Sequence, residues 1–79
     1  MDKDEQDRKK FLEEQLEWCK EQGRILEEID SKLHEMKQIA EYALNHELTS
    51  VEIDQLNGQL HVLQSEVQLL EKQLHSVVH

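Results

Sequence analysis

Residues 53–77 read IDQLNGQLHVLQSEVQLLEKQLHSV, and this stretch decides the fold. Its apolar side chains recur at alternating spacings of three and four residues: Ile53, Leu56, Leu60, Leu63, Val67, Leu70, Leu74 and Val77. This spacing is typical of the buried a and d positions of a coiled coil. A helix with such a stripe needs a second helix to cover it, so the stretch predicts helix packing.

The first half of the chain carries a similar pattern. Two sets of residues repeat there at every seventh position, one set three residues after the other: Leu26, Leu33 and Ala40, and Ile29, Met36 and Ala43. The same spacing argument assigns these residues to a and d positions of a first helix. The two halves do not share one phase, because the interval from Leu26 to Ile53 falls one residue short of whole heptads.

The phase changes between residues 45 and 50. Thr49 is followed three residues later by Glu52, which matches the capping box that satisfies free backbone N–H groups where a helix begins. This predicts a turn over residues 46–49. Because neither Gly nor Pro marks the break, one uninterrupted helix with a local stutter is the alternative.

A register test favours the hairpin. In an antiparallel pair of helices each a position of one helix meets a d position of the other, so the numbers of the two paired residues must have a constant sum. The a and d residues of the two halves of this chain meet that requirement. We therefore expect an all-α, antiparallel helical hairpin, with a first helix over about residues 4–45, a second over about 50–78 and an N-terminal overhang over 1–16. The predicted seam between the helices comprises Leu26, Ile29, Leu33, Met36, Ile53, Leu56, Leu60, Leu63, Val67 and Leu70.

The charges agree with this pairing. In a parallel zipper made of two copies of the second helix, Glu66 would face Glu71, and like charges oppose that arrangement. In the antiparallel hairpin, Lys32 faces Glu66 instead. The sequence therefore predicts an ion pair between the two helices.

Further apolar residues lie beside the seam and predict an interface. They are Phe11, Trp18, Ile25 and Ile39 in the first half and Val62 and Leu69 in the second. A large exposed apolar strip on a small protein commonly marks a contact surface. The expected use is self-association of two hairpins into a homodimeric four-helix bundle. The alternative is that the strip binds a helix of another protein.

Composition excludes several classes of function. The 79 residues carry a formal net charge of -9, which repels nucleic-acid backbones and anionic membrane surfaces. We expect no nucleic-acid partner and no membrane partner. The same charge allows a second interpretation, a small acidic inhibitor, antitoxin or DNA-mimic regulator that covers a basic site on a partner protein.

No motif for catalysis or metal binding is apparent. His75 and His79 have helical i, i+4 spacing but no further ligand beside them, and Cys19 is expected to be a small buried side chain. We therefore expect no enzyme activity, no cofactor, no metal site and no small-molecule substrate. The single cysteine fits a cytoplasmic location. The sequence thus predicts a non-enzymatic protein–protein interaction module, an adaptor or regulator, that self-associates through its helices.

Overall fold

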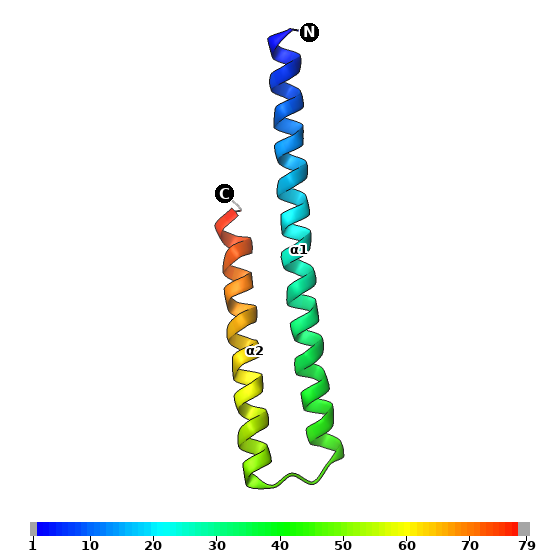
Figure 1. The fold of residues 1–79 in the computed structure, drawn as a ribbon, viewed down its shortest axis with the longest axis vertical. Coiled ribbons are helices and arrows are strands. Elements are labelled where there is room, and N and C mark those ends of the chain that lie inside the picture. Colours follow the sequence, from blue (N-terminus) through cyan, green and yellow to red (C-terminus); the bar gives the residue numbers. More distant parts are fainter. Residues whose placement is uncertain (1, 78–79) are drawn as a thin grey trace.

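The chain folds into two α-helices joined by a short turn (Figure 1). The computed structural model describes the backbone of residues 2–77 and the side chains of residues 2–74. Helix α1 spans Lys3–Asn45 and helix α2 spans Ser50–Val77. The described chain forms a rod with extents of 70 × 19 × 13 Å. The expectation of an all-α chain of two helices is confirmed.

Helix α1 begins at a side-chain cap. The carboxylate of Asp2 accepts hydrogen bonds from the backbone N–H groups of Asp4, at 2.7 Å, and Glu5, at 3.4 Å. These are two of the N–H groups that have no partner within the helix. The chain contains no Pro, so nothing interrupts the backbone hydrogen bonding of the 43-residue helix.

The turn comprises residues 46–49. Its first residue, His46, has an extended backbone, and its Nδ1 lies 2.8 Å from the carbonyl oxygen of Tyr42 in the last turn of α1. The rings of His46 and Tyr42 also stack, with centroids 4.0 Å apart. The ring of His46 thus covers a helix end whose carbonyl groups have no partner further along the chain.

Helix α2 begins with the predicted capping box. The backbone N–H of Glu52 donates to Oγ1 of Thr49 at 3.2 Å, and the backbone N–H of Thr49 donates to Oε1 of Glu52 at 3.3 Å. The two residues satisfy each other's free N–H groups. The reset of the apolar pattern is therefore a turn, and the alternative of one continuous helix with a stutter is wrong.

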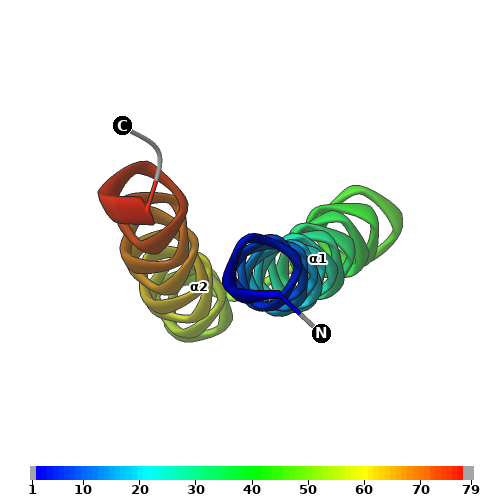
Figure 2. The same ribbon diagram turned by 90° about the horizontal axis from the view of Figure 1, so that it is seen from above.

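The two helices differ in length, and α1 runs on past the end of α2 (Figure 1). Figure 2 shows the helices side by side, without a third layer over either of them. The buried apolar side chains are Ile25, Leu63, Val67 and Leu70. This core lies toward the open end of the hairpin and away from the turn. Burial of one such side chain stabilises a fold by about 1.5–3 kcal/mol, so a core of this size is small.

Three residues named from the sequence fall outside the described side chains. Val77 is the last member of the apolar ladder, and His75 and His79 are the histidine pair with helical spacing. Within the described residues, neither helix contains a stretch long and apolar enough to cross a membrane.

Candidate interaction surfaces

The seam between α1 and α2 contains most of the residues predicted for it. Leu63, Val67 and Leu70 are buried, and Ile29, Met36, Leu56 and Leu60 are half-buried. The exceptions are Leu26, Leu33 and Ile53, which are exposed. Two of these three exceptions lie on α1, so the difference concerns mainly which face of α1 meets α2.

Helix α1 is rotated about its axis relative to the predicted packing. Ile25 is 2 % exposed, whereas Leu26 is 54 % exposed. Neighbouring residues of a helix point about 100° apart, so only one of the two can point at α2. The column of Ile25, Lys32 and Ile39 lies in the seam, and the column of Leu26 and Leu33 lies beside it. The assignment of Leu26 and Leu33 to the seam is therefore corrected.

An ion pair accompanies this rotation. Nζ of Lys32 contacts Oε2 of Glu66 across the two helices, as the sequence predicts. The hydrogen bond that Lys32 donates to Glu66 raises the pKa of Lys32, partial desolvation of the ammonium lowers it, and the charges of Glu66 and other nearby carboxylates raise it further. Lys32 stands in the column of Ile25 and Ile39, so the rotation that buries Ile25 also brings this ammonium to α2.

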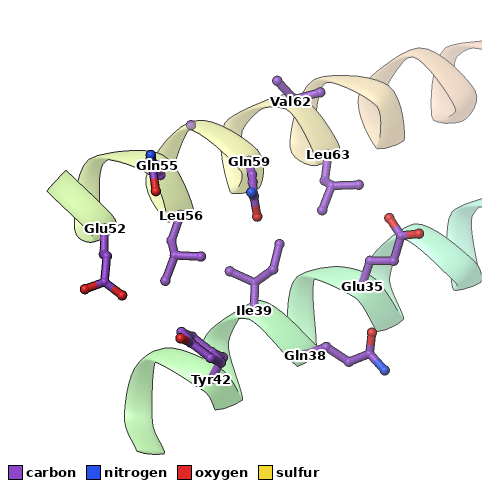
Figure 3. Close-up of a pocket in the computed structure, with 11 residues that line it drawn as sticks. Glu35, Gln38, Ile39, Tyr42, Glu52, Gln55, Leu56, Gln59, Val62 and Leu63 are labelled. Carbon is purple, nitrogen blue, oxygen red and sulfur yellow. The ribbon is translucent and has the colours of Figure 1, made fainter. Parts of the chain in front are cut away.

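The first surface is a groove between the helices near the turn. It has a volume of about 1010 Å³ and is lined on its apolar side by Ile39, Tyr42, Leu56, Val62 and Leu63. Ile39 of α1 points between Leu56 and Leu63 of α2 (Figure 3). We call this side of the hairpin the groove face.

The groove face carries negative charge. Its lining includes the carboxylates of Glu35 and Glu52, and no Lys or Arg is among the described residues that line it. In the sequence, residues 38–71 contain no Lys or Arg either. This end of the molecule therefore presents an apolar groove with carboxylates at its edge.

The second surface lies on the opposite side of the hairpin. Leu26 and Leu33 of α1 lie on the side of the seam away from Tyr42, and Ile53 and Leu60 of α2 lie on the side away from Val62, as the helical repeat requires. Leu26, Leu33 and Ile53 are all exposed. We call this surface the back face.

The back face is bordered by few charges on α2. Asn57 and Gln64, which are uncharged, follow the column of Ile53 and Leu60 at its outer edge. Charges of both signs border the back face, namely Asp30 and Lys37 on α1 and Glu71 on α2, whereas the charged residues that line the groove are the carboxylates of Glu35 and Glu52. Cys19, which was expected to be buried, is exposed and lies in the heptad column of Leu26.

The structure places the six residues predicted for an interface in two different environments. Phe11, Trp18, Val62 and Leu69 are exposed, whereas Ile25 is buried and Ile39 is half-buried in the seam. Ile25 and Ile39 are thus corrected from the interface to the hairpin's own packing. Val62 lines the groove, and Leu69 follows it one heptad later on the same side of α2.

Sequence reasoning missed two residues. Tyr42 follows Ile39 by three residues, a helical spacing that places it beside the seam, and it lines the groove. Gln22 is buried, and its Nε2 has no hydrogen-bond partner among the described residues. The antiparallel register places Gln22 opposite Leu74, one heptad before Ile29, but nothing in the apolar pattern signals that its amide is buried there without a partner.

Within the described residues, no three His, Cys, Asp or Glu side chains gather in an arrangement that could hold a metal ion. Comparisons with protein-family models, with curated proteins and with solved structures find no match to the chain. The groove face and the back face are therefore the features that bear on its function.

Proposed function

We propose that this protein is a small, non-enzymatic protein–protein interaction module that self-associates through its helices. The observation that carries the proposal is the exposure of the back face. Leu26 is 54 % exposed and Leu33 is 49 % exposed on a hairpin with few buried apolar side chains. Several exposed apolar side chains on one side of a small protein are typical of interfaces.

A second copy of the chain is the favoured partner for the back face. Two hairpins that cover each other's apolar columns form a four-helix bundle, in which every helix gains a neighbour. Charge favours the back face over the groove face for this contact. A second copy also carries a net charge of -9, and the carboxylates of Glu35 and Glu52 beside the groove repel it.

Two matched substitutions test which face makes the contact. Leu33→Glu places a charge on the back face, and Leu69→Glu places the same charge on the side of the groove. We expect Leu33→Glu to reduce the mass measured by light scattering to that of one chain, 9.4 kDa, and Leu69→Glu to leave a dimer.

The opposite result would assign self-association to the groove side, where Val62 and Leu69 were first predicted to act. Circular dichroism of both variants serves as the control that the helices are retained. A single-chain mass for the unsubstituted protein would contradict the proposal itself.

A second candidate function is binding to a basic partner, as an acidic inhibitor, antitoxin or DNA-mimic regulator would do. The absence of Lys and Arg from the described residues that line the groove, beside the carboxylates of Glu35 and Glu52, favours it. A synthetic amphipathic helix of lysine and leucine is a suitable probe. We expect the double variant Glu35→Gln, Glu52→Gln to bind the probe more weakly than the control Glu13→Gln, Glu14→Gln. Equal affinities would show that net charge alone attracts the probe.

A further inference from the structure

The overhang of α1 and the back face near the turn are both uncovered in the single chain. Phe11, Leu12 and Leu16 of the overhang are exposed, as are Leu33 and Ile53 of the back face. We propose that a second copy covers the back face in an antiparallel arrangement. The two α1 helices then cross near Gly23, and each overhang lies over the turn half of the other chain. This proposal rests on the self-association proposed above.

The position of the basic run along α1 favours the antiparallel over the parallel arrangement of the two copies. The run of consecutive basic residues, Arg8–Lys10, lies in the overhang between the acidic residues Asp4, Glu5 and Asp7 on one side and Glu13 and Glu14 on the other. Residues 38–71 contain Asp and Glu but no Lys or Arg, and the carboxylates among them that lie nearest the turn are Glu41, Glu47, Glu52 and Asp54. A parallel pair sets these carboxylates beside their own copies. An antiparallel pair sets Arg8–Lys10 level with Glu41, Glu52 and Asp54 near the turn instead, and opposite charges in proximity favour that orientation.

The apolar columns also match in the antiparallel direction. Leu16 and Gly23 are seven residues apart and share one column, and Leu26 and Leu33 share the adjacent column. In one antiparallel register, Leu16 of each chain faces Leu33 of the other and Gly23 faces Leu26. Leu12 and Leu16 of the overhang, which share the columns of Leu26 and Gly23, are then covered, and they cover the part of the back face that α2 leaves open.

Gly23 has a role in this arrangement that the hairpin alone does not provide. A Cβ atom built at Gly23 meets no atom within 4 Å in the single chain, so packing against α2 does not require a glycine there. Glycine in a helix interior destabilises the helix relative to alanine. At a crossing of two helices, the missing side chain leaves room for Leu26 of the other chain.

Distances between spin labels test the arrangement directly. One nitroxide per chain is attached in a Cys19→Ser background, either at Lys9→Cys or at Glu27→Cys, and the label-to-label distance is measured by pulsed electron resonance. In the proposed register, the two Lys9→Cys sites lie about 45 Å apart along the axis at 1.5 Å per residue. The two Glu27→Cys sites lie less than about 10 Å apart along the axis by the same rise.

The outcomes separate this inference from the proposed function. A long distance at Lys9→Cys together with a short one at Glu27→Cys supports the antiparallel dimer. Short distances at both sites, in a protein with the mass of a dimer, overturn the antiparallel arrangement and leave self-association standing. A mass of one chain, with no measurable coupling between labels, overturns both.

A pair of glycine variants provides the second test. Gly58 also has nothing within 4 Å of an added Cβ, but it lies outside the back face. We expect Gly23→Ala to raise the dissociation constant of the dimer about tenfold, because the added methyl group overpacks the contact with Leu26 of the other chain. Gly58→Ala is expected to leave that constant unchanged. Equal dissociation constants for the two variants would overturn the crossing at Gly23.

Discussion

Ile25 and Leu26 are adjacent in the chain, yet Ile25 is 2 % exposed against α2 and Leu26 is 54 % exposed on the back face. Ile25 thus belongs to the packing between the two helices, and Leu26 belongs to the apolar surface that the hairpin leaves uncovered. Their side chains are of equal size and point about 100° apart. They therefore form a matched pair for separating folding from association.

The first prediction concerns this pair. Ile25→Ala removes buried atoms and is expected to lower the free energy of unfolding by about 2 to 5 kcal/mol at every protein concentration. Leu26→Ala is expected to weaken the dimer, so its effect on thermal unfolding grows with protein concentration. Thermal unfolding followed by circular dichroism over a dilution series measures both. Equal, concentration-independent effects would place both residues in one core.

The second prediction concerns the unpaired amide of Gln22. Its Nε2 is buried without a hydrogen-bond partner among the described residues, and such a group costs about 1–3 kcal/mol. Gln22→Leu is therefore expected to raise the free energy of unfolding by an amount of that order. The exposed Gln68→Leu serves as the control with the same change of side chain. Chemical denaturation that finds Gln22→Leu less stable would show that the amide has a partner.

The third prediction concerns the cap of α2. Thr49→Ala removes the Oγ1 acceptor for the N–H of Glu52 and is expected to cost about 1 kcal/mol. Ser50→Ala, at the next position, leaves both hydrogen bonds of the capping box in place and is expected to cost less. A urea titration of both variants measures the difference. If Ser50→Ala proves the more damaging, Ser50 and not Thr49 caps the helix.

Much of the hairpin could be predicted from the sequence. Periodicity and the capping box predicted two helices and the turn, and the charge pattern predicted the contact of Lys32 with Glu66. The rotation of α1 could not be predicted in the same way. Apolar residues occupy the columns of both Ile25 and Leu26, so spacing alone supports either face.

The candidate surfaces were predictable only in part for the same reason. The interface assignment relied on which apolar column was left over after the seam was filled. Once Ile25 and Ile39 enter the seam, Leu26 and Leu33 become the residues left over. The groove was not predictable, because its volume depends on how far apart the helices lie near the turn.

The fourth prediction concerns pH. The pKa of Lys32 is raised in the folded chain above its ordinary value of 10.5, chiefly by the hydrogen bond that Lys32 donates to Glu66. A raised pKa means that the contact stabilises the fold below that value and stops doing so as the pH rises through the folded-state pKa. Glu66→Gln is expected to lower stability at neutral pH and to reduce the loss of stability at alkaline pH.

Urea titrations at neutral and alkaline pH measure this effect. Glu71→Gln removes a carboxylate from the same helix and is expected to leave the alkaline loss unchanged. If Glu66→Gln and the original protein lose stability in parallel as the pH rises, then the contact with Glu66 is not what raises the pKa of Lys32.

The most direct test of self-association is the mass of the unsubstituted protein in solution, measured by sedimentation equilibrium over a series of dilutions. The exposed Leu26 and Leu33 predict a mass of two chains, twice 9.4 kDa, that falls toward one chain on dilution. A mass of 9.4 kDa at every concentration would contradict self-association through the back face.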